Sequence, residues 1–155
     1  MPARSTFEYA VVRVVPSVER GEFLNAGVIL FSRERGYLAA RVALDARRLR
    51  SLAPTLDAAT LATLTAHLDS IPRVAAGEPD AGPIARLSQP ERYHWLVAPR
   101  STMVQISEVH SGLCDDPAAA LDRLFDELVT VHPRSRQRSH SQGAETSGSR
   151  RPAGS

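Results

Sequence analysis

Apolar residues in the first third of the chain fall into three short runs of strand length. Residues 7–15 and residues 26–32 are apolar on both faces, a pattern typical of strands covered on both sides. Residues 37–44 alternate more clearly between apolar and polar positions. Pro16 ends the first run, because proline can neither donate to a ladder nor continue one. We expect the first strand to be central and the other two to form a hairpin.

Later segments carry apolar residues at helical spacing, each preceded by a capping residue. Asp45 and Asp57 are predicted N-caps, and each lies next to a leucine that can pair with another leucine in the first turn. Pro72 is predicted to end the second helix. Asp116 and Pro117 occupy the favoured N-cap and first positions of a closing helix, which has an apolar stripe at Leu121, Leu124, Phe125 and Leu128.

The segments between these elements are less regular. Ser88 and Glu91 resemble a capping box and favour a short helix, while alternation at Tyr93, Trp95 and Val97 leaves a strand open. Residues 102–108 alternate as a fourth strand, and residues 110–116 are predicted to be a loop. Residues 77–83 are rich in turn formers and predict a mobile loop. The whole pattern predicts an α+β fold with a small, mainly antiparallel sheet of about four strands packed against three to four helices.

Composition divides the chain into a domain and a tail. Residues 1–132 hold fourteen arginines and sixteen acidic residues, whereas residues 133–155 hold five arginines and one glutamate. The tail has almost no apolar residues, so we expect a single α+β domain at 1–132 and a disordered tail at 133–155. The domain lacks the clustered positive charge of a nucleic-acid surface, so nucleic acid is expected to bind at most weakly through the tail.

The sequence also bears on the compartment. Cys114 is the single cysteine, which excludes an internal disulfide, and no positive segment leads into an apolar stretch at the N-terminus. The apolar runs are too short to span a bilayer. We therefore expect a cytoplasmic protein that does not bind a membrane.

Two polar groups stand at the predicted starts of strands, where side chains from different strands can converge. They are Arg20, Glu22 and Asn25 before the second strand, and Arg100, Ser101 and Thr102 before the fourth. One interpretation is a ligand-binding site for an anion, with Arg100 as a forked donor. The other is a turn held by pairing of arginine with carboxylate, for instance Glu22 with Arg100.

Other candidates for chemistry are weaker. His110 is a candidate general base and Cys114 a candidate nucleophile, but a lone cysteine is more often a buried packing residue. Asp115 and Asp116 are candidate metal ligands, but a loop acid followed by Asp and Pro at a helix start is accounted for by capping alone. The sequence contains no zinc-ligand spacing, no P-loop and no GxGxxG pattern, so we expect no metal and no cofactor.

Several long segments carry a family resemblance. They read EYAVVRVVPSVERGEFLNAGVILF, LDSIPRVAAGEPDAGPIARL and ERYHWLVAPRSTMVQISEVHSGLCDD, followed by the closing helix. Over roughly residues 6–131 the chain resembles the bacterial family known as domain of unknown function 3037. Residues that fit the family pattern are Arg20, Glu22, Asn25, Gly27, Pro99, Arg100, Ser101, Thr102, Gln105, His110 and Gly112.

The resemblance carries no established activity, but it implies neighbouring genes for kinases resembling HipA. Our first hypothesis is therefore an accessory or regulatory binding module whose partner is a HipA-like kinase. The alternative is an enzyme or receptor for an anionic small molecule, bound by the two polar groups, with Glu22 or His110 as the catalytic proton-transfer residue.

Overall fold

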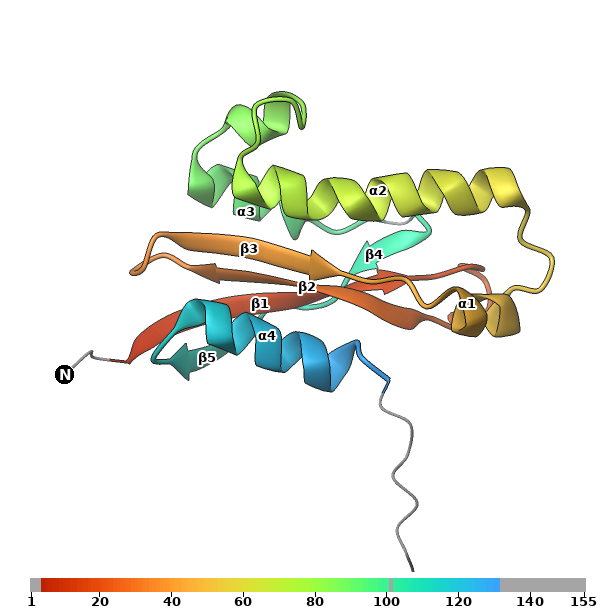
Figure 1. Ribbon diagram of the computed structural model, residues 1–155, viewed down its shortest axis with the longest axis horizontal. Coiled ribbons are helices and arrows are strands. Elements are labelled where there is room, and N and C mark those ends of the chain that lie inside the picture. Colours follow the sequence, from red (N-terminus) through yellow and green to blue (C-terminus); the bar gives the residue numbers. More distant parts are fainter. Residues whose placement is uncertain (1–3, 101, 132–155) are drawn as a thin grey trace, which may run out of the picture.

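The computed structural model describes residues 4–100 and 102–131, which form three layers with a sheet between helices (Figure 1). The α+β prediction is confirmed, with five strands where about four were expected. The strands are β1 (Ser5–Val14), β2 (Leu24–Ser32), β3 (Tyr37–Val42), β4 (Val104–Ile106) and β5 (His110–Cys114). The tail predicted from residue 133 lies outside the described residues.

β1 is the central strand, as its apolar faces predict. It pairs antiparallel with β2 on one side and with both β4 and β5 on the other. β2 and β3 form the expected antiparallel hairpin. The β1–β2 and β2–β3 pairings join consecutive strands, whereas β4 and β5 pair with β1 after the intervening helices.

The prediction of a loop at residues 110–116 is wrong for β5. The segment His110–Cys114 pairs with the start of β1, although three of its five residues are exposed and Cys114 alone is buried. Gly112 lies opposite Phe7, and a Cβ on Gly112 would come within 2.5 Å of the Phe7 ring. The Phe7 ring therefore fills the space that a side chain at position 112 would occupy. Because position 112 is a glycine, the alternation of buried and exposed residues typical of a strand cannot be read from the sequence.

Four α-helices and one 3₁₀ turn complete the fold, and they are α1 (Ala46–Leu52), α2 (Ala58–Ala76), η1 (Pro83–Arg86), α3 (Gln89–Leu96) and α4 (Pro117–Leu128). The predicted N-caps are confirmed, since Asp45, Asp57, Ser88 and Asp116 each accept a backbone N–H in the first turn. The segment after Ser88 is a helix, so the alternative of a strand there is wrong.

α2 does not stop at Pro72, contrary to the sequence prediction. It continues to Ala76 and ends at Gly77, whose left-handed conformation closes the helix with bonds to the carbonyls of Arg73 and Val74. Val74 and Ala75 are buried against the sheet. Burial of this last turn and its glycine cap outweigh the lost hydrogen bond at Pro72.

Two hydrophobic cores lie on the two faces of the sheet. The first, which we call the α2 core, packs α1, α2 and α3 on one face through residues that include Leu49, Leu64, Leu68, Ile71, Tyr93 and Leu96. The second, the α4 core, lies under α4 and includes Phe7, Val28, Leu30, Leu121, Leu124 and Phe125. In Figure 1 α2 and α4 lie on opposite sides of the sheet.

An irregularity in the pairing of β1 with β2 turns Asn25 toward α4. The register shifts between Val12 and Arg13, which pair with Gly27 and Asn25 and leave Ala26 as the extra residue. Such a bulge reverses the alternation beyond it. Leu24 and Ala26 thus join the α2 core, while the Asn25 amide donates to the carbonyl of Leu128 at the end of α4 over 3.0 Å.

Candidate functional site

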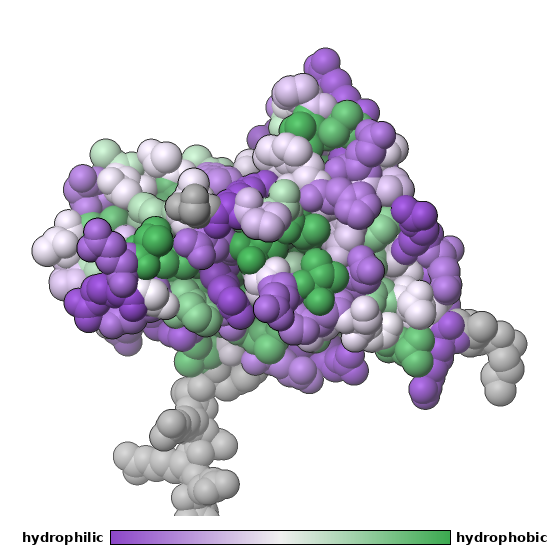
Figure 2. Space-filling model, turned by 180° about the vertical axis from the view of Figure 1, so that it is seen from behind, coloured by the Kyte–Doolittle hydropathy of each residue, from purple (hydrophilic) through white to green (hydrophobic). Residues whose placement is uncertain are grey.

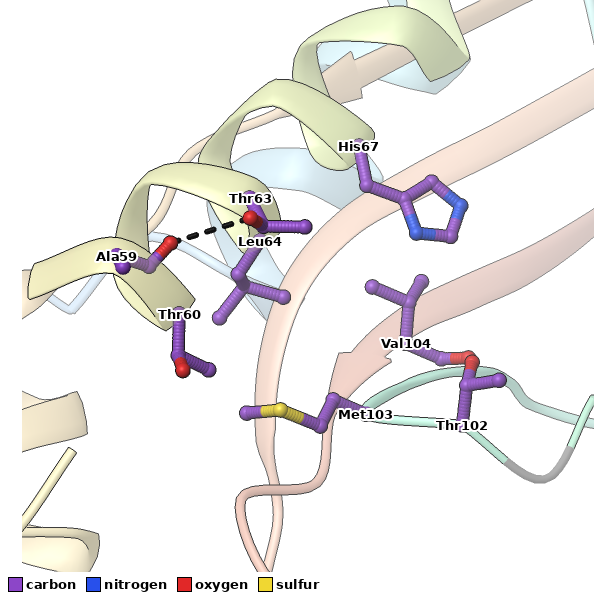
Figure 3. Close-up of a pocket in the computed structure, with 8 residues that line it drawn as sticks. All are labelled: Ala59, Thr60, Thr63, Leu64, His67, Thr102, Met103 and Val104. Atoms are coloured by element: carbon purple, nitrogen blue, oxygen red, sulfur yellow. Dashed lines mark hydrogen bonds between the residues drawn. The ribbon is translucent and has the colours of Figure 1, made fainter. Parts of the chain in front are cut away.

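An open groove runs between α2 and the segment that leads into β4, and we call it the α2–β4 groove (Figure 3). Its volume is about 380 Å³. α2 contributes residues spaced along one helical face, and the opposite wall comes from the start of β4. The lining residues are Ala59, Thr60, Thr63, Leu64, His67, Thr102, Met103 and Val104.

The groove is mostly apolar, and two of its hydroxyl groups are already bonded. Thr63 Oγ1 donates to the carbonyl of Ala59 over 3.1 Å, the bond drawn in Figure 3. Thr102 Oγ1 donates to the carbonyl of Val104 over 2.9 Å. These threonines therefore present methyl groups as well as bonded oxygens, and the floor is formed by the buried side chains of Leu64 and Val104.

His67 and Arg100 meet at the end of the groove. A guanidinium nitrogen of Arg100 lies 3.3 Å from Nε2 of His67. Because a guanidinium can only donate, Nε2 accepts this bond and the imidazole is neutral. Burial first, and the positive charge of Arg100 second, lower the pKa of His67. Both observations indicate an uncharged His67 near neutral pH.

Arg100 is itself fixed by α3. It donates to the carbonyl of Trp95 over 3.2 Å, and its guanidinium carbon lies 4.5 Å from the centre of the Trp95 ring. Burial lowers the pKa of Arg100. A smaller cavity of about 180 Å³ shares His67 with the groove and is lined in addition by Trp95 and Arg100. His67 therefore lies at the border of two hollows on the α2 face.

The structure places the first predicted polar group away from this groove. Arg20 pairs with Glu22 over 2.9 Å in the connection between β1 and β2, and both side chains are exposed. The carboxylate of Glu22 therefore has Arg20, its near neighbour in sequence, as its partner. Asn25 lies on the α4 side, as described above.

The second predicted group is divided. Arg100 and Thr102 lie beside the groove on the α2 side, and Ser101 lies outside the described residues. Asn25 contacts α4 and Arg100 contacts α2, so the sheet lies between them (Figure 1). The two groups are not brought into one pocket by the residues that the structure describes.

His110 and Cys114 are separated along β5. The His110 ring lies 5.3 Å from the Tyr9 ring, whereas Cys114 is buried opposite Ser5 at the far end of the strand. Four residues of strand span about 13 Å, too far for proton transfer between the two. Burial is the main cause that raises the pKa of the Cys114 thiol, which fits a packing residue.

His67, Thr60 and Thr63 are groove residues that the sequence analysis did not single out. They recur on α2 at a spacing of three and four residues, which places them on one helical face. That polar line beside the apolar stripe was a usable signal for a surface of α2. The contact of His67 with Arg100 was not predictable, because the two residues are 33 positions apart in the sequence.

Over residues 4–100 and 102–131, no group of three or more histidine, cysteine or acidic side chains is placed to hold a metal ion. The same residues include no helix long and apolar enough to cross a membrane. The fold and groove define a small three-layer α+β protein with an open, mostly apolar surface cleft.

The chain belongs to the family described as protein of unknown function (DUF3037), whose model matches residues 9–129. The resemblance seen in the sequence is thereby confirmed. No significant match is found among curated proteins or among solved structures.

Proposed function

We propose that this chain is an accessory binding module that takes a segment of a partner protein into the α2–β4 groove. The observation that supports this most is the groove itself, an open cleft of about 380 Å³ with an apolar floor. Protein segments dock through such clefts by placing apolar anchors in them. Met103 on one wall is a flexible side chain suited to varied partner surfaces.

The polar groups around the groove favour binding over chemistry. His67 is the titratable side chain in the lining, and its Nε2 already accepts from Arg100. The lining residues that the structure describes include no serine or cysteine that His67 could activate, and the threonines at 63 and 102 donate to backbone carbonyls. A nucleophile with an adjacent base is the usual arrangement for covalent catalysis.

Outside the cavities, the exposed hydrophobic residues offer a less defined docking site. Large hydrophobic side chains that are exposed include Phe23, Trp95, Val109 and Leu113. Figure 2 shows the side on which β4 and β5 lie, and hydrophobic residues there form small groups among polar ones. Small separate patches are ordinary on a protein surface, whereas a cleft with an apolar floor is a more specific feature.

The family resemblance supplies the partner to test, a HipA-like kinase from the same genome. We place the interaction in the cytoplasm, where the buried free thiol of Cys114 would stay reduced. Thr63→Arg is the variant of choice, because residue 63 is exposed on α2 and lines the groove. The matched control is Thr65→Arg, since Thr65 is also exposed on α2 and bonds its own helix in the same way but lies outside the lining.

The experiment is co-purification followed by titration calorimetry at about micromolar concentrations, typical of regulatory complexes. We expect a complex with the unaltered chain and with Thr65→Arg, and a loss of roughly tenfold or more in affinity for Thr63→Arg. Absence of any complex contradicts the kinase as partner. A complex that Thr63→Arg leaves unchanged contradicts the groove as its site.

A further inference from the structure

A different cavity lies apart from both the α2–β4 groove and the hollow beside Arg100, on the same face of the sheet, where α3 passes over β1, β2 and β5. Its volume is about 320 Å³. Side chains of contrasting charge and an aromatic wall surround it. They include Glu8 on β1, Phe31 at the end of β2, Arg33 just after it, and Tyr93 on α3.

Tyr93 brings an unused hydrogen-bonding group to this cavity. The side chain is 2% exposed, and its hydroxyl is buried without a hydrogen-bond partner. Burial, followed by the nearby Glu8 carboxylate, raises the pKa of Tyr93 far above its ordinary value, so the hydroxyl keeps its proton. Glu8 is the acceptor nearest in effect to that proton, since its carboxylate favours the protonated hydroxyl, but the two groups form no hydrogen bond of 3.5 Å or less. A buried donor of this kind is costly unless something accepts from it.

Two opposite charges at the cavity are also uncompensated by their neighbours. Glu8 and Arg33 are both exposed, and neither forms an ion pair with another residue that the structure describes. By contrast, Arg20, Arg41 and Arg73 each have a carboxylate within 3 Å. A cavity that offers a carboxylate and a guanidinium outside the ion pairs of the described residues suits a ligand that carries both complementary charges.

An aromatic wall completes the cavity. The rings of Phe31 and Tyr93 stack with their centres 4.5 Å apart, and both are nearly fully buried. Aromatic faces favour ammonium groups as well as apolar side chains. A volume of about 320 Å³ is at the small end of the range for ligand sites, which fits a metabolite of low molecular mass.

We propose that this cavity binds a small zwitterion of the α-amino acid type. The ligand ammonium group lies at Glu8, its carboxylate pairs with Arg33, and its side chain packs against the aromatic wall. The Tyr93 hydroxyl donates to the ligand carboxylate. This site is separate from the α2–β4 groove and its occupancy does not depend on the proposed partner.

Titration calorimetry tests the proposal with glycine, L-leucine, L-phenylalanine and L-glutamate as probes, each taken to about 10 mM, a limit that detects millimolar binding. We expect at least one probe to bind. Glu8→Gln and Arg33→Gln should each weaken that probe roughly tenfold, because each removes a hydrogen-bonded charge. Glu19→Gln and Arg86→Gln, at exposed positions outside the cavity, are the matched controls and should bind as the unaltered chain does.

A ligand analogue separates the two charges. The carboxylic acid that lacks the amino group of the binding probe should bind less tightly, and Glu8→Gln should not weaken it further. Thermal unfolding of each variant shows whether it is folded. The proposal is overturned if no probe binds, if the analogue binds as tightly as the amino acid, or if folded Glu8→Gln and Arg33→Gln variants bind the probe unchanged.

Discussion

Gly27 is required for space rather than for backbone conformation. A Cβ at this position would lie 2.7 Å from the carbonyl oxygen of Arg41 and 2.8 Å from a methyl group of Val42. We expect Gly27→Ala to lower the free energy of unfolding by about 1–3 kcal/mol, the usual cost of overpacking. Urea denaturation measures it. Val42→Ala in the same chain should restore the loss only in part, because the Arg41 contact is with backbone. A Gly27→Ala variant as stable as the unaltered chain contradicts this packing.

His67 should make the stability of the fold depend on pH. Its pKa is lowered in the folded state, chiefly by burial and then by Arg100. As pH falls through the ordinary histidine value of about 6.5, the unfolded chain takes up the proton first, so stability is lost in that direction.

His67→Gln tests this dependence, because an amide oxygen can still accept from Arg100. We expect the midpoint of thermal unfolding to fall less steeply between about pH 7 and pH 5 in this variant than in the unaltered chain. Differential scanning fluorimetry over that range measures the two slopes. Parallel slopes would show that His67 does not titrate differently on folding.

At the scale of single residues, features that depend on neighbours in the sequence could be predicted, whereas contacts between distant residues could not. Asp45, Asp57 and Asp116 were predicted as caps because capping involves neighbours within three residues. The contact of His67 with Arg100 depends on how α2 lies over the sheet. A lone histidine in an amphipathic helix gives no sign of such a partner.

At the scale of elements, the continuation of α2 beyond Pro72 leads us to predict that replacing this proline stabilises the fold. Proline within a helix removes one hydrogen bond and crowds the carbonyl four residues earlier. We expect Pro72→Ala to raise the free energy of unfolding by about 1 kcal/mol or more, since alanine is the better helix residue. Urea denaturation measures it, and Ala66→Pro on the exposed face of the same helix should be strongly destabilising. A loss of stability in Pro72→Ala would mean that the packing of Val74 and Ala75 requires the proline.

The elements that the sequence missed were decided by tertiary contacts. The sequence predicted that α2 ends at Pro72, but the helix continues because its next turn is buried and ends at a glycine cap. β5 has little apolar alternation because it is an edge strand with Gly112 beneath the Phe7 ring. Edge strands of this kind pair through backbone groups that every sequence possesses.

At the scale of the whole molecule, the sheet separates two surfaces. The α2 face carries the α2–β4 groove and the cavity beside Glu8 and Arg33, while the other face packs against α4. The α+β fold and its central strand could be predicted from the hydrophobic pattern.

The separation of Asn25 from Arg100 could not be predicted in this way, because a bulge at Ala26 turns Asn25 to the other face of the sheet. One extra residue in a strand is invisible to a rule based on alternation.

Hydrogen–deuterium exchange of the complex with the HipA-like kinase tests the central claim most directly. Exchange reports the protection of individual segments on partner binding. We predict slower exchange on binding at residues 59–67 and 102–104, with the α4 segment unchanged. Protection confined to α4 and β3, with the groove segments unaffected, would contradict the account.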